Sequence, residues 1–320
     1  MLGLILLLQS LIVAVAGPPS SPEYLPIRVA DAYGYFAKER VAVTIKSTRA
    51  ESGAAEALAQ GQADLAATSL EAMFRFGYRA QSPRIVFALT AAPPTPLLVS
   101  TAHAGVTSVK DLERGKIAFV TPGSPEQIWL LALLAKSGIR ATGVELLSLG
   151  PRGVVTALDS GDAMAAFVSE PAASGLVKDG RARLLIDLKS PPAIADALGA
   201  PTVHAAVFMR GDRRPKDRDL AAFARAILEA QQLIATGNAA ELAERLPRSV
   251  ATPDEEFVRR VEAMQGIYLP GGIVTTDALA HTIDIVRTHV PLPRLLKIPK
   301  PQDMLYLEPT RRALKARPPA

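Results

Sequence analysis

The sequence predicts an α/β protein made of two similarly built lobes, each with a largely parallel β-sheet. Two observations lead to this fold class. Short aliphatic runs alternate with helix-like segments over the first 210 residues, and one stretch of the chain is repeated 100 residues further on. At 320 residues the chain is also long enough for two lobes of ordinary domain size.

The N-terminal run LIVAV, residues 11–15, fits either a buried β-strand or the end of a secretion signal. Its aliphatic, mostly β-branched residues stop at a Gly-Pro-Pro turn, which indicates a strand. The apolar residues 1–8 and the small residues 14–16 indicate a signal, but neither Lys nor Arg precedes Arg28. We therefore expect a strand over residues 11–16 and an export signal upstream of Met1.

The other elements follow from aliphatic runs and helical periodicity. Nine further strands are predicted at residues 41–47, 64–69, 85–89, 95–101, 116–121, 143–149, 163–169, 183–188 and 203–210. Helices such as GAAEALAQ and SPEQIWLLALLAKSG separate many of these strands. After Arg210 the pattern becomes helical, over residues 216–237, 240–246, 253–264 and 276–290.

The internal repeat aligns residues 53–72 with residues 153–172, with eight of twenty positions identical. Each copy reads as a helix, a glycine turn, a strand and then a serine, Ser69 or Ser169. Ligands of open α/β sheets bind beyond the carboxyl ends of the strands. Two facing lobes are therefore expected to aim Ser69 and Ser169 into one cleft.

Composition excludes several kinds of protein. There is no cysteine, hence no disulfide or thiolate metal site, and the four histidines lack metal-ligand spacing. Residues 291–320 hold seven basic and two acidic residues, which equals the whole formal net charge of +5. A basic tail without regular aromatic interleaving or a recognisable nucleic-acid-binding module predicts no nucleic-acid partner. We expect residues 306–320 to be disordered.

Four segments carry a family resemblance: LPIRVADAYGYFAKERVAVTI (25–45), GQADLA (61–66), TSVKDLERGKIAFVTPGS (107–124) and GDAMAAFVSEP (161–171). Together they resemble the NMT1/THI5-like superfamily, the solute-binding proteins of ABC importers for nitrate, sulfonates, taurine and thiamine-pyrimidine precursors. The resemblance runs from about residue 11 to residue 290. It implies a type II periplasmic-binding fold, two α/β lobes joined by two hinge crossings around a ligand cleft.

The resemblance also implies how the chain is divided and what it does. Residues 1–98 and 205–305 would form lobe 1, and residues 99–204 lobe 2. The implied protein is a periplasmic monomer without cofactor or enzymatic activity that binds a small molecule and works with an importer's permease and ATPase. In such proteins the segment LIVAVAG corresponds to the first, central strand.

An enzyme on the same fold is the alternative function. It would be cytosolic and resemble either menaquinone-pathway enzymes or pyrimidine synthases. The latter carry a cysteine-rich iron motif, which this chain lacks. Nucleophilic-triad, phosphate-loop and paired-carboxylate spacings are also absent from the sequence.

Candidate ligand contacts lie after the first strand and around the first serine of the repeat. Ser20, Ser21 and Tyr24 offer two hydroxyls and a stacking face, although a proline-stiffened surface turn explains them equally simply. Thr68 and Ser69 precede a helix, with a glutamate three residues after Thr68. This spacing predicts a capping box, and a helix N-terminus also suits a polar ligand.

The second lobe offers two similar segments. In TPGSPEQ, Ser124 is a predicted N-cap closed by Gln127, and Gly123 lets the backbone approach a ligand; capping alone is the alternative. Ser169 and Glu170 end a strand, where the next residue, a proline, favours an extended conformation. An ordinary exposed glutamate is the alternative there.

Three single residues complete the analysis. Thr90 follows the predicted strand at 85–89, and His204 starts the return crossing, so both are candidates for the cleft. Trp129 lies among leucines on a helix and is expected in the core, with ligand stacking as the alternative.

The charge of the ligand stays open. Helix N-termini and hydroxyls suit a sulfonate, nitrate or carboxylate. Glu23, Glu71, Glu126 and Glu170 suit an amine or an aminopyrimidine.

Overall fold

The computed structural model describes residues 10–77, 79, 82–294 and 296–316 of the chain. The strands are β1 Leu11–Val15, β2 Val43–Ser47, β3 Leu65–Ser69, β4 Arg84–Ala88, β5 Leu97–Ser100, β6 Lys116–Phe119, β7 Glu145–Ser148, β8 Ala165–Phe167, β9 Ala182–Ile186 and β10 Ala205–Met209. The α-helices are α1 Leu25–Ala32, α2 Tyr35–Lys38, α3 Glu51–Ala59, α4 Leu70–Phe76, α5 Pro125–Lys136, α6 Gly150–Ser160, α7 Ala172–Lys178, α8 Pro191–Leu198, α9 Asp217–Thr236, α10 Ala239–Arg245, α11 Glu255–Ala263, α12 Thr276–His289 and α13 Glu308–Lys315.

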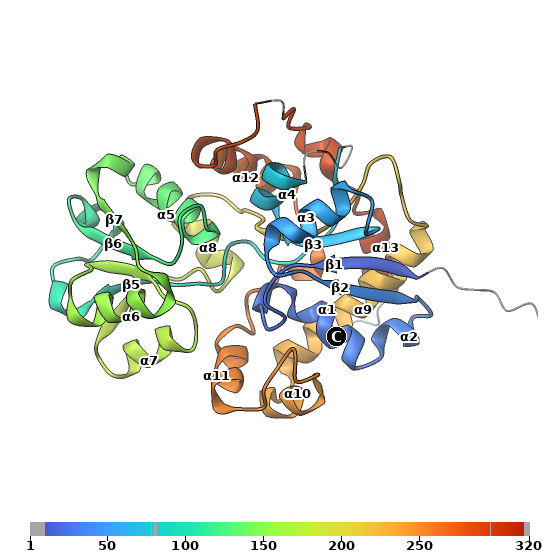
Figure 1. Cartoon of the computed structure of the whole chain (residues 1–320), viewed down its shortest axis with the longest axis horizontal. Helices are drawn as coiled ribbons and strands as arrows, with labels where there is room; N and C mark the ends of the chain where they lie inside the picture. The colour runs from blue at the N-terminus through green and yellow to red at the C-terminus, as the bar shows by residue number, and fades with distance from the viewer. Residues whose placement is uncertain (1–9, 78, 80–81, 295, 317–320) are drawn as a thin grey trace, which may run out of the picture.

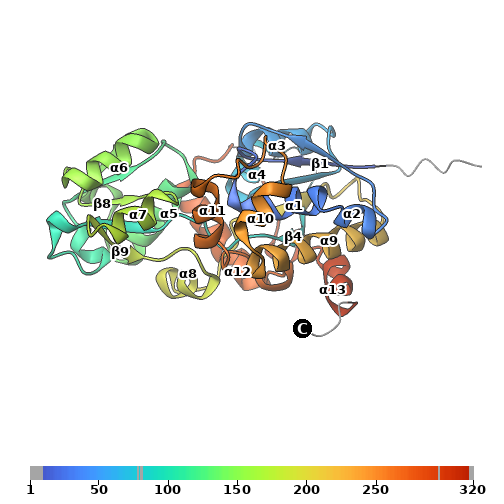
Figure 2. The same cartoon turned by 90° about the horizontal axis from the view of Figure 1, so that it is seen from below.

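The strands form two five-stranded sheets, which lie in two lobes side by side along the long axis of the molecule (Figures 1 and 2). The sheet of the first lobe has the order β2-β1-β3-β10-β4, and that of the second lobe has β7-β6-β8-β5-β9. Both follow one plan, with three parallel strands joined to an antiparallel fourth. The predicted fold class, two α/β lobes, is confirmed.

The internal repeat corresponds to equivalent parts of the two lobes. Its first copy covers most of α3 and the whole of β3, and its second covers most of α6 and the whole of β8. Both β3 and β8 occupy the third position of their sheets. Gly161 ends α6 at a φ of 80°, and Gly61 has a φ of 69°, conformations that a side chain would strain.

Strand β1 lies at an inner position of the first sheet, between β2 and β3. Val13 pairs with Ile45 on one side and with Leu65 on the other, and its side chain is fully buried. The strand stops at Gly17, whose φ of 131° favours glycine. Residues 11–15 are therefore a strand of the core, whereas residues 1–9 of the signal interpretation lie outside the described residues.

Two crossings connect the lobes, one between β4 and β5 and the other leading from α8 to β10 (Figure 1). They are joined to each other, because the Thr202 hydroxyl donates to the Ala91 carbonyl at 2.7 Å and the His204 N–H donates to the Thr90 carbonyl at 2.8 Å. Strand β5 belongs to the second sheet from Leu97 onwards, so the boundary expected at residues 98–99 falls inside this strand.

Helices cover both faces of the first sheet. α1, α2 and α13 pack against the long helix α9 on one side, and α3 and α4 pack together on the other (Figure 1). None of the helices in the described part of the chain is long and apolar enough to span a membrane.

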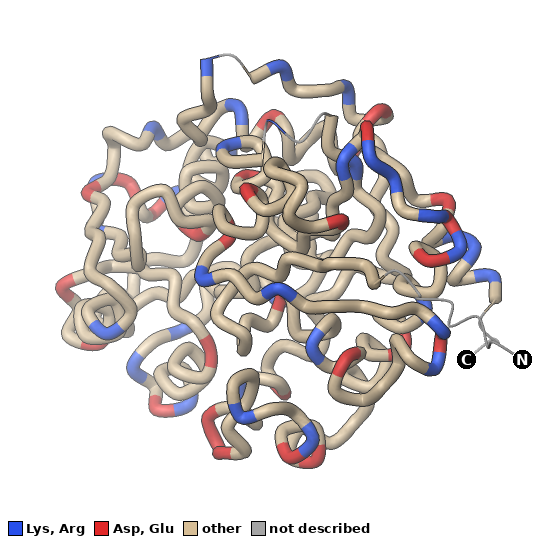
Figure 3. The backbone as a smooth tube through the Cα atoms, turned by 45° about the vertical axis from the view of Figure 1, so that its right-hand side comes forward, with Lys and Arg blue, Asp and Glu red and all other residues tan. Residues whose placement is uncertain are grey.

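The expectation of a disordered tail is wrong for residues 308–315, which form α13. One face of this helix is buried, with Thr310 and Ala313 both 0% exposed, and the Thr310 hydroxyl donates to the Val86 carbonyl at 2.5 Å. The basic side chains Arg311, Arg312 and Lys315 remain exposed. A count of charged residues does not show that α13 has one buried and one basic, exposed face. Along the whole backbone, Lys and Arg residues lie interspersed with Asp and Glu residues (Figure 3). Residues 317–320 lie outside the described residues.

Removal of β1 tests whether the fold needs this strand. A chain that begins at Gly17 loses a buried inner strand, so we expect aggregated or molten material without a cooperative thermal transition. Circular dichroism melting and size-exclusion chromatography measure this, with a chain that begins at Ser10 as the control. A soluble, cooperatively melting chain beginning at Gly17 would contradict the expectation.

Candidate functional site

The centre of the candidate site is a buried ion pair between Glu71 and His204. Glu71 lies in the first turn of α4, directly after β3, and His204 directly precedes β10, the antiparallel neighbour of β3. Because Ala205 pairs with Ser69, this register brings the two side chains together, with His204 Nδ1 3.0 Å from Glu71 Oε1. Glu71 is 3% exposed and His204 1%.

Trp129 joins this pair from the second lobe. It lies on α5, and its indole N–H donates to Glu71 Oε1 at 3.2 Å. Its ring also meets the His204 ring edge-on, with the ring centroids 6.1 Å apart. The expectation that Trp129 is buried is correct, but it lies at the junction of the two lobes rather than within one of them.

A second carboxylate, Glu51, lies at the start of α3 and accepts three donors. Glu51 Oε2 accepts from the Thr68 hydroxyl at 2.7 Å and from the Ser69 N–H at 2.5 Å, and the Tyr24 hydroxyl donates to both carboxylate oxygens at 2.8 and 2.9 Å. Tyr24 is buried, and its hydroxyl is engaged by Glu51; its expected role as a stacking face for the ligand stays a prediction.

A third carboxylate, Glu23, is partly buried in the 3-10 turn Pro22–Tyr24. The pKa of Glu23 is raised to about 7, mainly by desolvation and also by the charges of Glu51 and Glu126, while His204 opposes the rise. The pKa of Tyr24 is raised well above its usual range by burial and by the charges of Glu51, Glu23 and Glu71. We call Glu23, Glu51, Glu71 and His204 the carboxylate–histidine cluster.

Within the cluster, the central pair is ionised. Burial alone would raise the pKa of Glu71, but the charge and hydrogen bond of His204, with help from Trp129, hold this pKa below its usual value. Burial alone would lower the pKa of His204, but Glu71 raises it to about 9. An imidazolium thus faces more than one carboxylate, and the cluster carries net negative charge.

Three buried atoms at this place have no hydrogen-bond partner among the described residues: Glu71 Oε2, His204 Nε2 and Thr90 Oγ1. Thr90 adjoins His204 through its own carbonyl and pairs with Tyr268 as an isolated bridge. Buried polar atoms are nearly always satisfied in native proteins. The cluster therefore has capacity to bind a small polar molecule.

The other residues of the first lobe that the sequence singled out have structural roles. Ser69 is the N-cap of α4 and accepts from the Ala72 N–H at 3.2 Å, whereas Thr68 and Glu71 both turn to other partners. The predicted Thr68–Glu71 capping box is therefore wrong, because the helix begins one residue later than the spacing assumed.

Ser20 and Ser21 lie beside the cluster rather than in it. Ser20 lines a pocket of about 10 Å³ together with Arg260, Met264 and Tyr268. The Tyr268 hydroxyl donates to the Pro22 carbonyl at 2.8 Å. Ser21 precedes the turn of Glu23, and its side chain makes no capping bond there.

In the second lobe, Gly123 and Ser124 mainly build the start of α5. Ser124 accepts from the Gln127 N–H at 3.4 Å, and the Gln127 side chain accepts from Gly123 rather than from Ser124. The Gly123 carbonyl accepts from Arg75 of the first lobe at 3.4 Å, so this loop also touches the opposite lobe.

Ser169 and Glu170 are separate from the cluster. Ser169 is exposed, and no bond among the described residues joins it to Ser69. Glu170 is buried rather than exposed, paired with Lys189 at 3.1 Å, and its carbonyl accepts from Arg260 of the first lobe at 3.2 Å. The exposed-glutamate alternative is therefore wrong.

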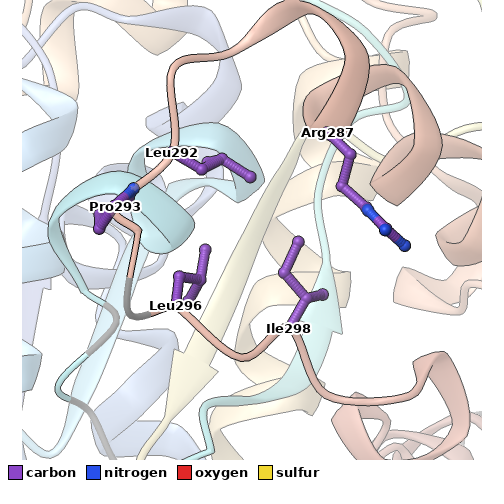
Figure 4. A pocket seen from close by; sticks show the side chains of 5 residues that line it. All are labelled: Arg287, Leu292, Pro293, Leu296 and Ile298. Atoms are coloured by element: carbon purple, nitrogen blue, oxygen red, sulfur yellow. The ribbon is translucent and has the colours of Figure 1, made fainter.

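A larger pocket of about 300 Å³ lies at the edge of the first lobe. Leu292, Leu296 and Ile298 line it with Pro293, and Arg287 of α12 lies across from them (Figure 4). It shares no residue with the cluster. Among the described residues, no group of acidic or histidine side chains is arranged to hold a metal ion.

The arrangement of two lobes, two hydrogen-bonded crossings and a polar cluster at their junction is that of a type II periplasmic-binding protein. Residues 21–236 match the family described as NMT1/THI5 like, and the chain belongs to that family.

Individual relatives agree with this assignment. The chain is 29% identical over 218 residues to the taurine-binding periplasmic protein of Escherichia coli K12, covering 65% of this chain and 62% of that protein. A solved structure from Bordetella bronchiseptica RB50 is similar with a TM-score of 0.70 and 25% identity, covering 96% and 97% of the two chains. The periplasmic aliphatic sulphonate binding protein SsuA of Escherichia coli has a TM-score of 0.67 and 18% identity, with 93% and 92% coverage.

The cluster predicts how stability depends on pH. The pKa of His204 is about 9 in the folded protein, compared with an ordinary value of 6.5. The stabilisation of the folded state by protonated His204 is therefore complete below pH 6.5 and is lost as the pH rises through 9. Glu23 adds a fall in the same direction between pH 4.5 and 7. The free energy of unfolding from urea titrations should therefore decrease between pH 6.5 and 9. The same decrease in His204→Asn would contradict this origin.

Proposed function

We propose that this protein is the ligand-binding component of an ABC importer. It binds a small polar organic ligand between its lobes and delivers that ligand unchanged to a permease and its ATPase in the inner membrane. The observation that carries the proposal is the carboxylate–histidine cluster, with its unpartnered buried atoms, at the junction of lobes and crossings. The similarity to a taurine-binding periplasmic protein supports the proposal.

Ligand binding and lobe movement are coupled at this cluster. Glu71 belongs to the first lobe, His204 ends a crossing, and Trp129 reaches in from the second lobe. A ligand that bonds to Glu71 or His204 must also accommodate the Trp129 ring. Hinge bending along the two crossings is therefore the proposed route of entry and release.

Enzymatic activity is the second candidate, and one observation favours it: a carboxyl such as Glu23, with a pKa of about 7, suits general acid–base catalysis. The hydroxyls beside the cluster argue against a nucleophilic mechanism. Thr68 donates to Glu51 and Ser69 caps α4, so neither is activated by His204. We therefore favour binding without chemistry.

A thermal-shift screen tests the proposed function. The panel contains taurine, alkanesulfonates, nitrate, aromatic carboxylates and aminopyrimidines. A compound at about 100 times its dissociation constant should add roughly 2.7 kcal/mol to the free energy of unfolding. The binding should weaken in Trp129→Ala and persist in Arg287→Ala, which alters the separate pocket of Figure 4. A compound that is consumed during incubation would support the enzyme instead.

Lobe closure gives a second measurement. Small-angle X-ray scattering should show a smaller radius of gyration with the best compound than without it, while circular dichroism stays unchanged. An unchanged radius at saturation would contradict movement of the lobes.

A further inference from the structure

We infer that the ligand of this site carries a protonated nitrogen, an ammonium or amidinium group, which the carboxylates of the cluster bind, and that simple anions are excluded. The inference rests on the proposed function and names its ligand class. It is carried by the balance of charges, by the hydrogen bonds already formed, and by the buried atoms that have no partner.

The charges near the site are predominantly acidic. Glu23, Glu51 and Glu71 all lie close enough to act on the Tyr24 hydroxyl. Glu126 approaches from α5 of the second lobe and acts on Glu23. The main positive charge that acts on Glu23 and Glu71 is that of His204, which Glu71 already pairs. A cation entering here gains attraction, whereas an anion meets net repulsion.

The hydrogen bonds point to the same ligand class. The N–H of Ser69, the donor that a bound anion would find at the start of α4, already donates to Glu51 at 2.5 Å. The hydroxyls of Thr68 and Tyr24 donate to Glu51 as well. The protein's own carboxylate thus occupies these three donors, so a bound anion cannot use them.

Free acceptors remain for a ligand that donates. Glu71 Oε2 is buried and has no partner among the described residues, and Thr90, 1% exposed, has an unpartnered hydroxyl beside His204. A carboxylate offers about four lone-pair positions, so Glu71 and Glu51 can accept further N–H donors. His204 Nε2 adds one donor, which suits an acceptor atom adjacent to the ligand's cationic nitrogen.

Matched pairs of probes test the inference. Benzamidinium is compared with benzoate, and n-butylammonium with butane-1-sulfonate, by isothermal titration calorimetry above the pKa of Glu23. At least one cation should bind, and its matched anion should bind tenfold more weakly or not at all. Binding of the anions without the cations would overturn the inference and leave the proposed function intact. If no probe of either sign binds, the inference also fails, and the broader screen decides the proposed function.

Variants tie the preference to the cluster. Glu23→Gln removes one charge, and Glu51→Gln removes another; each should weaken binding of the cation at least tenfold. Because ionised Glu23 destabilises the fold, Glu23→Gln should bind more weakly even though its thermal stability is not lowered. Glu56→Gln, an exposed position on the same helix as Glu51, is the matched control and should bind as the wild type does. Because Glu51→Gln also loses structural bonds, Glu23→Gln decides the outcome. Wild-type affinity for the cation in Glu23→Gln would overturn the inference.

Discussion

The buried ion pair between Glu71 and His204 is the interaction on which the arrangement of this protein depends. Two charges are removed from water there, a cost of several kcal/mol for each ion that is offset only by mutual attraction and further hydrogen bonds. Loss of one partner from such a pair costs about 3 to 5 kcal/mol. The pair therefore fixes α4 against the start of β10, and through Trp129 it also fixes the second lobe. A single electrostatic unit links the sheet, the hinge and the opposite lobe.

Much of the fold could be predicted from the sequence, but the site could not. Each of the ten strands overlaps a predicted one, because each is a short run rich in aliphatic residues that is bounded by turn residues. The ion pair joins residues 133 positions apart, and it forms only because β10 enters the first sheet beside β3. Periodicity carries no information about that strand order. The position of Trp129 among leucines on a helix predicts that its side chain is buried. That position does not show that its indole N–H donates to a residue of the other lobe.

Comparison of the two repeat copies shows where the lobes differ. The turn glycines and the serines are shared, whereas Thr68 and Glu71 of the first copy correspond by position to Val168 and Pro171 of the second. Glu51 lies two residues before the first copy, and Pro151 stands at the same offset before the second. The scaffold is thus common to both lobes, and the polar groups of the cluster belong mainly to the first. Of the serines that the repeat emphasised, Ser69 is the last residue of β3 and caps α4, whereas Ser169 lies two residues beyond the end of β8. The positions at which the two copies differ, rather than those at which they are identical, therefore indicate the site.

The central claim is that a ligand binds at the carboxylate–histidine cluster between the lobes. A crystal structure with the tightest-binding compound of the screen tests it most directly. The account predicts a ligand nitrogen within hydrogen-bond distance of Glu51 or Glu71, with the Trp129 ring in contact with the ligand. A ligand bound beside Ser169, in the pocket at Arg287, or at the cluster solely through His204 would contradict the account.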